Sequence, residues 1–403
     1  MNDFEGVLVF SRRGAGAVRA VVEVLREKGQ RPVLVSERPN DPNRDLCDAH
    51  LVIDWDEQDL KHFVAAVEAA GVVPAGIVNV VESLMAWQIA VARLYGLPGG
   101  EKARETFLSK ARVRTVMRDN GYSDLWFAGG FAGSFEVGSV PRYPVIVKPA
   151  RDTGGSRLVR KADTPEELGA ALDAIADAAG DETELVIEEY IEGVEFSVDG
   201  PVVDGVFHGI FVVEKTQHNE QRHHDAGLRL HPPVSAGVTT AARELSGKVG
   251  ALCRDLEFSQ GWLHVEGRAG AGGAVELVEI NVRSGGGLYR VATRHACHID
   301  PVDVVVSVAL GQPSRTPRDT PRDCRLALIP FDADRVGDVV DITPLEEMKA
   351  LPEVLDGYVL DSYRVYSLDY ENFVAEFLVH GDDAAHLLDA CRRVTSAFSY
   401  RIA

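Results

Sequence analysis

Two acidic residues, an amide and an arginine fall at spacings that could place them on one face of a two-stranded hairpin. Glu266 ends one apolar run and Glu279 lies in the next, and a Gly- and Ala-rich turn joins the two runs. Residues two apart in a strand point to the same face of a sheet. Asn281 and Arg283 therefore share a face with Glu279, and Glu266 can lie opposite. We expect a compact group of oxygen donors beside one cation.

This donor set suits a hard divalent cation. Mg²⁺ takes a few protein oxygens and fills its coordination shell with water and substrate phosphates. Arg283 could stabilise charge on a transferring phosphoryl group, and the run from Ser284 to Gly287 would let a small ligand approach the backbone. A merely charged hairpin face would explain the carboxylates but not the asparagine, the arginine and the glycine run in register. We therefore predict a metal site for Mg²⁺ or Mn²⁺ at Glu266, Glu279 and Asn281.

A second candidate is the turn after the apolar run that begins at Val145. Lys148 ends this run, and a loop of small residues from Asp152 to Ser156 follows it. Such a loop lets backbone N–H groups approach phosphate oxygens, and the lysine adds positive charge. No Gly-Lys-Ser/Thr follows, so the segment is not a Walker A motif. A plain turn with a solvated lysine explains the segment equally well.

A third candidate is the acidic segment from Glu188 to Glu195, where a strand-like run ends before Gly193. Carboxylates in this segment could accept hydrogen bonds from an exocyclic amine and from ribose hydroxyls. The extended backbone could pair with the edge of a purine. Taken alone, the segment is better explained as an exposed strand end with solvated carboxylates.

Two other patterns fit a functional reading less well. Gly14 and Gly16 follow the first apolar run, as in a dinucleotide-binding turn, but Arg19 stands where a third glycine is required. An NAD-dependent oxidoreductase would also leave the segment from Glu266 to Arg283 unexplained. The polar, histidine-rich stretch from Glu214 to His224 lacks the ligand spacing of a zinc site. We expect an ordinary strand-to-helix turn at the first place, and either a mobile, substrate-facing loop or a plain surface loop at the second.

The elements that carry these residues change character near residue 100. Before it, short apolar runs alternate with helical stretches, which predicts a parallel α/β sheet with helices on both faces. After it, a basic helical stretch from Lys102 to Asn120 leads into strands and a helix from Pro165 to Ala179, which predicts an α+β unit. The segment after Pro321 is expected to form short strands and one late helix, from Ala384 to Phe398.

Composition limits the classes of partner. The chain has 403 residues, 45% of them hydrophobic, which suits two or three domains. A net charge of -20 disfavours nucleic acid and anionic membranes as partners. We see no apolar run long enough for a membrane span and no signal-peptide pattern at the start. The five cysteines are scattered and form no Cys-x-x-Cys pair, which indicates free thiols in a reducing cytoplasm.

Taken together, the segments resemble the ATP-grasp superfamily, and within it the carboxylate–amine ligases that include the L-amino acid ligases, or dipeptide synthases. The likeness covers about residues 7–310. It rests on the order of five segments, Ser109–Lys110, Pro144–Pro149, Glu188–Glu195, His264–Glu266 and Glu279–Gly286. The chain departs from many relatives at Ser109, where they carry an acidic residue, and at Val282, where they carry proline.

The resemblance implies an ATP-grasp fold that combines α/β and α+β parts. An N-terminal parallel α/β domain would span residues 1–100, and a helical linker would span residues 101–140. A small central α+β lid would occupy residues 141–200. A larger C-terminal domain with an antiparallel sheet, together with a tail, would occupy residues 201–403.

The resemblance also implies roles for individual residues. The adenine amine would meet Glu188, the purine edge the backbone of Glu189 and Ile191, and the ribose Glu195. The whole ATP site would comprise Lys110, Lys148, Thr153, Gly154, Gly155, Ser156, Glu188, Glu189, Ile191 and Glu195. The metal ligands would be Glu266, Glu279 and Asn281. Lys148 and Arg283 would be catalytic, and the acyl phosphate would lie against Arg283, Ser284, Gly285 and Gly286.

The activity implied is an ATP-dependent ligation of a carboxylate to an amine through an acyl phosphate, with amino acids or a biosynthetic intermediate as substrates. The partners would be small molecules, and a homodimer is consistent with the family. Two alternatives stay open: an ATP-grasp enzyme that loads an acyl group onto the thiol of a carrier protein, and a non-catalytic relative that binds nucleotide.

Overall fold

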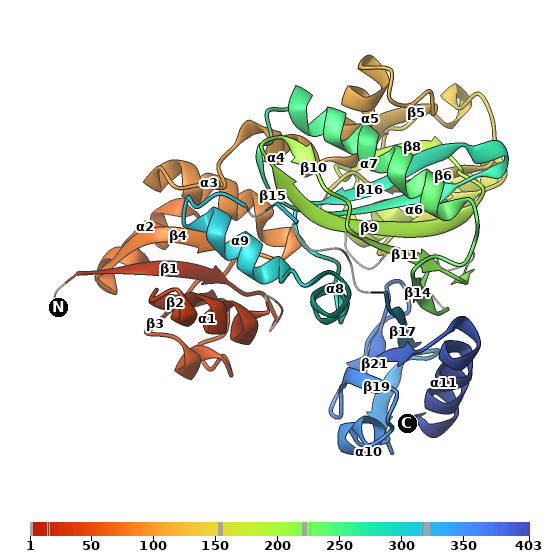
Figure 1. Ribbon diagram of the computed structural model, residues 1–403. Helices are drawn as coiled ribbons and strands as arrows, with labels where there is room; N and C mark the ends of the chain where they lie inside the picture. The colour runs from red at the N-terminus through yellow and green to blue at the C-terminus, as the bar shows by residue number, and fades with distance from the viewer. Residues whose placement is uncertain are drawn as a thin grey trace.

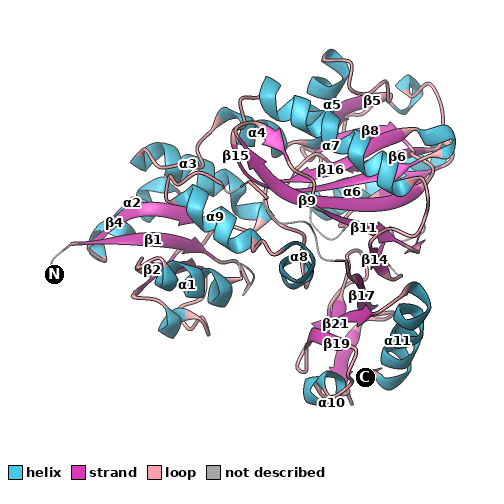
Figure 2. Cartoon of the chain, viewed as in Figure 1, coloured by secondary structure: helices cyan, strands magenta, loops and turns pink. Residues whose placement is uncertain are grey.

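The computed structural model describes residues 3–13, 15, 17–151, 156–219, 224–225, 227–314, 316–317 and 323–403, with only the backbone at 218–219 and 224–225. Figure 1 shows a parallel sheet at the N-terminus, a large sheet with a smaller sheet and helices beside it, and a C-terminal extension of the large sheet. Helices and strands occur together in each region (Figure 2). This combination of α/β and α+β parts is the fold class that the sequence predicts.

The N-terminal sheet is parallel throughout, as predicted. Its strands are β1 (Phe4–Phe10), β2 (Pro32–Ser36), β3 (Ala49–Val52) and β4 (Val72–Val78), in the order β3-β2-β1-β4. Both faces of β1 are buried, which is why its sequence is a continuous apolar run rather than an alternating one. Because β1 and β4 are parallel neighbours, the polar residues that follow them lie at the same edge of the sheet.

Helices cover both faces of this sheet. One face packs against α2 (Leu60–Ala69) and α3 (Met85–Tyr95). The other packs against α1 (Val18–Glu27) and against α9 (Pro301–Ala309), which comes from much later in the chain and was not predicted. Figure 1 shows α9 lying along the N-terminal sheet. A side chain at Gly76 would come within 2.6 Å of the Ala309 carbonyl oxygen, so glycine lets α9 approach β4 closely.

The predicted basic helical stretch from Lys102 to Asn120 is two helices, α4 (Lys102–Phe107) and α5 (Lys110–Asp119). The chain breaks at Ser109, which is extended, and its hydroxyl accepts a hydrogen bond from the Arg112 N–H at 3.4 Å. This N-cap starts a new helix. The predicted stretch is thus helical, but a helical pattern of basic residues does not show the cap within it. The break places Lys110 in the first turn of α5.

The smaller sheet, with helix α6 (Pro165–Ala179) packed on it, occupies the region expected as the lid and is called the lid below. Its strands run in the order β5-β8-β6-β7 and are β5 (Phe127–Phe131), β6 (Val145–Pro149), β7 (Arg160–Ala162) and β8 (Glu184–Glu189). Strand β5 falls inside residues 101–140, expected as a helical linker. The sheet ends at Glu189, earlier than the expected boundary at residue 200.

The large sheet is antiparallel in every pairing of its main path, β16-β15-β9-β11-β14-β17-β21-β19. Its strands are β9 (Val194–Val203), β10 (Val206–Phe207), β11 (Phe211–Lys215), β14 (Arg229–His231), β15 (Gln260–Ala269), β16 (Val275–Asn281), β17 (Arg325–Asp332), β19 (Val354–Val359) and β21 (Phe373–Gly381). The tail was expected to form short strands. Instead, β17 and β21 have 8 and 9 residues and continue the large sheet.

The remaining strands and α-helices complete the fold. They are β12 (His218–Asn219), β13 (His224–Asp225), β18 (Gly337–Val340), β20 (Arg364–Val365), β22 (Arg401–Ile402), α7 (Val238–Asp255), α8 (Tyr289–Cys297), α10 (Leu345–Lys349) and α11 (Ala384–Ala397). Helix α11 begins at Ala384, as predicted. In the described part of the chain, no helix is both long and apolar enough to cross a membrane.

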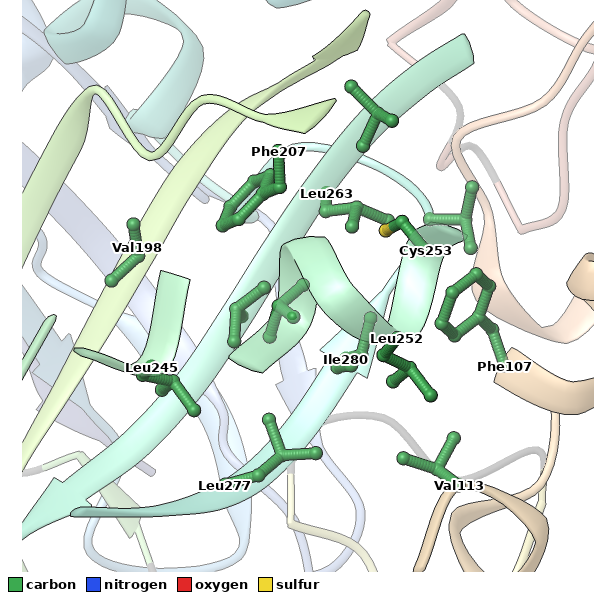
Figure 3. Close-up of a cluster of buried hydrophobic side chains, with 14 of the residues drawn as sticks. Phe107, Val113, Val198, Phe207, Leu245, Leu252, Cys253, Leu263, Leu277 and Ile280 are labelled. Carbon is green, nitrogen blue, oxygen red and sulfur yellow. The ribbon is translucent and has the colours of Figure 1, made fainter. Parts of the chain in front are cut away.

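A single apolar core joins the large sheet to α4 and α5. Leu245 and Leu252 of α7 pack against Leu277 and Ile280 of β16, and Phe107 of α4 packs in the same cluster (Figure 3). Full burial of such side chains contributes about 1.5–3 kcal/mol each. The helix that carries Lys110 is therefore anchored to the same core as the strand that carries Glu279.

Candidate active site

The three regions enclose one large cleft of about 1620 Å³. Pockets for small ligands commonly measure about 300–1,000 Å³, so this cleft has room for a nucleotide and further substrates. Its walls come from the N-terminal sheet, the lid, the β15–β16 hairpin, α8 and the tail. Examples from these regions are Arg12, Lys148, Glu266, Arg290 and Glu376.

The β15–β16 hairpin has the predicted register. Glu266 lies directly opposite Glu279, and His264 lies opposite Asn281. The register shifts immediately after the Glu266–Glu279 pair, which makes Val278 the extra residue of a bulge. All three residues predicted to bind metal line the cleft. The structure thus brings together the oxygen donors that the alternating pattern predicts.

Each of the two carboxylates has a lysine beside it. Lys110 Nζ lies 2.9 Å from Glu279, and Lys215 Nζ lies 2.9 Å from Glu266. Burial alone would lower the pKa of Lys110, but the Glu279 and Glu82 carboxylates outweigh it and raise that pKa. Burial alone would raise the pKa of Glu266, but Lys215 and His264 hold it well below its ordinary value. Each carboxylate therefore has a cation beside it. The sequence analysis did not single out Lys215 as a site residue.

The donors fit Mg²⁺, which prefers carboxylate and amide oxygens. Among the described residues, no three His, Cys, Asp or Glu side chains are grouped as a complete protein metal site. Glu266, Glu279 and Asn281 would supply only part of a coordination shell. A cation that keeps water and substrate oxygens as ligands suits such an incomplete set.

Arg283 lies beyond the end of β16 but lines the same cleft. Its Nη2 lies 3.0 Å from Glu82, a residue that sequence reasoning missed. Glu82 follows β4 at the edge of the N-terminal sheet. Burial and the nearby charge of Glu279 raise the pKa of Glu82. The predicted guanidinium is thus present in the site, and its orientation depends on the N-terminal domain.

Lys148 is the penultimate residue of β6 and donates to two partners, the Glu188 carboxylate at 2.7 Å and the Val278 carbonyl at 3.4 Å. Glu188 also accepts from Arg114 Nε at 2.7 Å, and Arg114 donates in turn to the Leu277 carbonyl at 2.7 Å. Burial would raise the pKa of Glu188, but Arg114 and Lys148 lower it to about 2. Both Glu188 oxygens are thus occupied, so Glu188 orients Lys148 in this structure rather than presenting a vacant acceptor.

Other residues of the acidic segment also form hydrogen bonds and ion pairs within the protein. Glu195 accepts from Lys215 at 2.7 Å and from Arg268 Nε at 3.0 Å. Arg268 Nη1 donates to the Ile191 carbonyl at 3.0 Å and to the Tyr190 hydroxyl at 2.9 Å. Arg268 was not predicted as a site residue, because its partners are distant in the chain. This arginine organises the part of the cleft expected to take adenosine.

The structure shows fewer contacts for the other residues that were predicted to bind ATP. Glu189 lines the cleft and lies 3.5 Å from Arg142. Ser156 also lines the cleft. The predicted phosphate-loop residues Thr153, Gly154 and Gly155 lie outside the described residues.

The glycine-rich loop from Ser284 to Gly287 lines the cleft beside Arg283. Its backbone is only partly open to a ligand. The Gly285 N–H donates to Asp199 Oδ1 at 2.9 Å. The Gly285 N–H thus already has a protein acceptor, and the predicted contact of this loop with an acyl phosphate stays a prediction. Asp199 lies on β9, and no local pattern marks it.

Comparisons with known proteins bear on the fold and on one segment. Residues 141–291 match the family described as the ATP-grasp domain. A search of curated proteins gives no match. The chain is similar to a crystal structure of an L-amino acid ligase from Bacillus licheniformis, with a TM-score of 0.81 and 16% identity over 100% of both chains.

Two further solved structures share the fold. One is the biotin carboxylase domain of the Hydrogenobacter thermophilus 2-oxoglutarate carboxylase, in complex with MgADP, ADP and bicarbonate. Its TM-score is 0.70 at 16% identity, over 99% of this chain and 90% of that chain. The other is an N5-carboxyaminoimidazole synthetase from Staphylococcus aureus complexed with ADP, with a TM-score of 0.68 at 12% identity over 99% of both chains. Residues 141–291 therefore form an ATP-grasp domain, and the whole chain shares the fold of these solved structures.

Proposed function

We propose that the protein is an ATP-dependent carboxylate–amine ligase. It would convert a carboxylate into an acyl phosphate and join the acyl group to an amine, with release of ADP and phosphate. The observation that carries this proposal is the Glu266–Glu279 pair beside Asn281, in the wall of a cleft that Lys148 and Arg283 also line. The shared fold of an L-amino acid ligase supports amino acids as the substrate class.

The lid and the hairpin would divide the nucleotide between them. The Lys148 amine, oriented by Glu188, and the Lys110 amine, beside Glu279, supply positive charge for the triphosphate. The adenosine end would lie near Glu195. Glu266, Glu279 and Asn281 would hold Mg²⁺, which when bound screens the phosphate charges and fixes their geometry.

The first chemical step would transfer the terminal phosphoryl group of ATP to an oxygen of the carboxylate, with ADP as the leaving group. A carboxylate is a poor electrophile, and phosphorylation gives it a leaving group. Arg283 lies where it can stabilise negative charge on the transferring group, and Glu82 holds its guanidinium in place at 3.0 Å. Lys110 reduces the repulsion between the two anionic reactants.

In the second step the amine nitrogen would attack the acyl carbon, the bond to the phosphate oxygen would break, and the amine would lose a proton. The chain would contribute mainly by positioning. Holding two reactants in a reactive geometry can supply about 7–11 kcal/mol of a barrier. Walls from the N-terminal sheet, the lid and the tail close around the hairpin, and this enclosure suits such positioning.

The test is release of ADP and phosphate from Mg-ATP over a panel of amino acids, supplied singly and in pairs, with products identified by mass spectrometry. Glu279→Gln is the control, because it keeps the size of the side chain and removes one metal-binding charge. We expect release that depends on a particular pair and is lost in the control. Binding of Mg-ATP without release for any pair would refute amino acids as the substrates. Release with bicarbonate alone would indicate carboxylation instead.

A further inference from the structure

The glycine-rich loop is fastened to the protein at two points. The Gly285 N–H donates to Asp199 at 2.9 Å, and the Leu288 N–H donates to Glu376 at 2.8 Å. Both acceptors are buried carboxylates, with exposed fractions of 0% for Asp199 and 1% for Glu376. Hydrogen bonds from N–H groups to ionised acceptors are roughly twice as strong as those to neutral ones. The loop is therefore held from both ends of its short span.

Asp199 ties the loop to the strand that carries the predicted metal ligand Glu266. Its Oδ1 also accepts from Trp262 Nε1 at 3.1 Å, and its Oδ2 accepts from His264 Nδ1 at 2.6 Å. Trp262, His264 and Glu266 all belong to β15. One side chain on β9 thus fixes the distance between the loop and the hairpin.

Glu376 ties the loop to the tail. It lies on β21, well beyond residue 291, where the ATP-grasp match ends. Its other oxygen pairs with Arg229 Nη1 at 2.9 Å. A side chain at Gly287, which has a φ of 57°, would collide with the Glu376 carboxylate. The tail therefore lies directly against the loop, and glycine is required there.

The two carboxylates accept hydrogen bonds from the Gly285 and Leu288 N–H groups and leave the amides between these residues open. Among the described residues, no oxygen accepts a hydrogen bond from the Gly286 or Gly287 N–H. Gly286 lines the cleft, with nothing within 4 Å of where a side chain would stand. We propose that Asp199 and Glu376 are positioning residues, which clamp the loop so that its central amides face the acyl phosphate. This assignment rests on the proposed ligase function.

The clamp matters because an N–H group stabilises developing charge only if it is already in place. A displacement of about 1 Å can lower a rate by about 100-fold. If either carboxylate is replaced by an amide, one amide oxygen remains where two carboxylate oxygens now accept hydrogen bonds from several donors. The Asp199→Asn and Glu376→Gln variants keep side-chain size while weakening the clamp at one point each.

A matched control is Glu214→Gln. Glu214 is also buried, and one of its oxygens accepts from the Val234 and Ser235 N–H groups at 2.9 and 2.8 Å. It holds a different loop, and it is absent from the cleft lining among the described residues. This variant removes the same kind of charged acceptor without touching the glycine-rich loop.

The experiment combines amide hydrogen exchange, read by mass spectrometry on peptides covering residues 284–288, with steady-state kinetics. In Asp199→Asn and Glu376→Gln we expect exchange there to be faster by about tenfold or more, kcat to fall by about 10–100-fold, and KM for ATP to change by less than about threefold. Glu214→Gln should speed exchange only around residues 234–235 and keep kcat within about twofold of the wild type.

The proposal is overturned if exchange at residues 284–288 is unchanged in both variants, or if their kcat falls no further than in Glu214→Gln. A parallel rise in KM for ATP would also overturn it, because that result would place the defect in the nucleotide site. If the unaltered protein turns over no substrate, the ligase proposal fails by itself. Exchange at residues 284–288 then decides alone whether the clamp exists.

Discussion

Replacing Glu188 with glutamine tests how much the buried ion network around this residue contributes to the free energy of unfolding. Glu188 is 3% exposed and holds two cations, Arg114 and Lys148, each at 2.7 Å. The Glu188→Gln change keeps the shape but leaves two buried positive charges with one neutral amide between them. We expect a large loss of stability, because buried charges without a counter-charge are costly.

The magnitude follows from the pKa of Glu188, which lies at about 2 against an ordinary value of 4.5. At about 1.4 kcal/mol for each pH unit, this difference corresponds to about 3 kcal/mol at neutral pH. Removing one partner of a buried pair generally costs about 3–5 kcal/mol. The folded-state pKa is depressed, so the contribution is complete above the unfolded-state pKa and is lost as the pH falls toward 2. At pH 3 it should be roughly 1 kcal/mol.

The assay is urea denaturation followed by circular dichroism, for the wild type and the variant at pH 7 and pH 3. The control is Glu184→Gln on the same strand, because Glu184 and its partner Arg151 are 40% and 33% exposed. An exposed pair contributes about 0–1 kcal/mol. The reasoning fails if Glu188→Gln costs no more than Glu184→Gln at pH 7, or if its cost is the same at both pH values.

Two further predictions concern the phosphate side of the site. Lys110→Met removes the cation 2.9 Å from Glu279. We expect it to weaken binding of a non-hydrolysable Mg-ATP analogue, measured by calorimetry, about 10–100-fold, because a charged hydrogen bond contributes about 1.5–3 kcal/mol. Lys102→Met, on the exposed side of α4, should leave this affinity unchanged, and equal affinities in the two variants would contradict the assignment. Gly287→Ala should lower the free energy of unfolding by about 1–3 kcal/mol, because its methyl group meets Glu376 at a positive φ. Gly286→Ala has open space and should change it by less than about 0.5 kcal/mol, so similar melting curves for the two variants would count against the packing described.

Features set by local pattern could be predicted from the sequence. The alternation around Glu266 and Glu279 fixes which residues share a face, and the observed register agrees. Helix α6 has the predicted bounds, Pro165–Ala179, because Thr164 caps it and proline occupies its first turn. The parallel N-terminal sheet follows from the alternation of apolar runs and helices. In each case the signal lies within a few neighbouring residues.

Features set by contacts between distant segments could not be predicted. Lys215 and Glu266 are separated by 51 positions, and Leu288 and Glu376 by 88. No spacing rule connects such residues before the sheet order is known. Glu376 was overlooked because its strand is buried along nearly its whole length and reads as core. The predicted residues lie together where one hairpin carries them, and the predicted set is incomplete where several strands converge.

Helix α9 has a consequence for how the chain must fold as it is synthesised. The four strands of the N-terminal sheet are complete at Val78, but α9, which covers one of its faces together with α1, ends only at Ala309. At about 5–20 residues per second, this apolar face waits on the order of tens of seconds for its second helix. Val7 and Val9 belong to the cluster that α9 completes. We therefore expect the first domain to reach its final packing after the ATP-grasp domain has emerged, and a fragment that stops near residue 100 to aggregate.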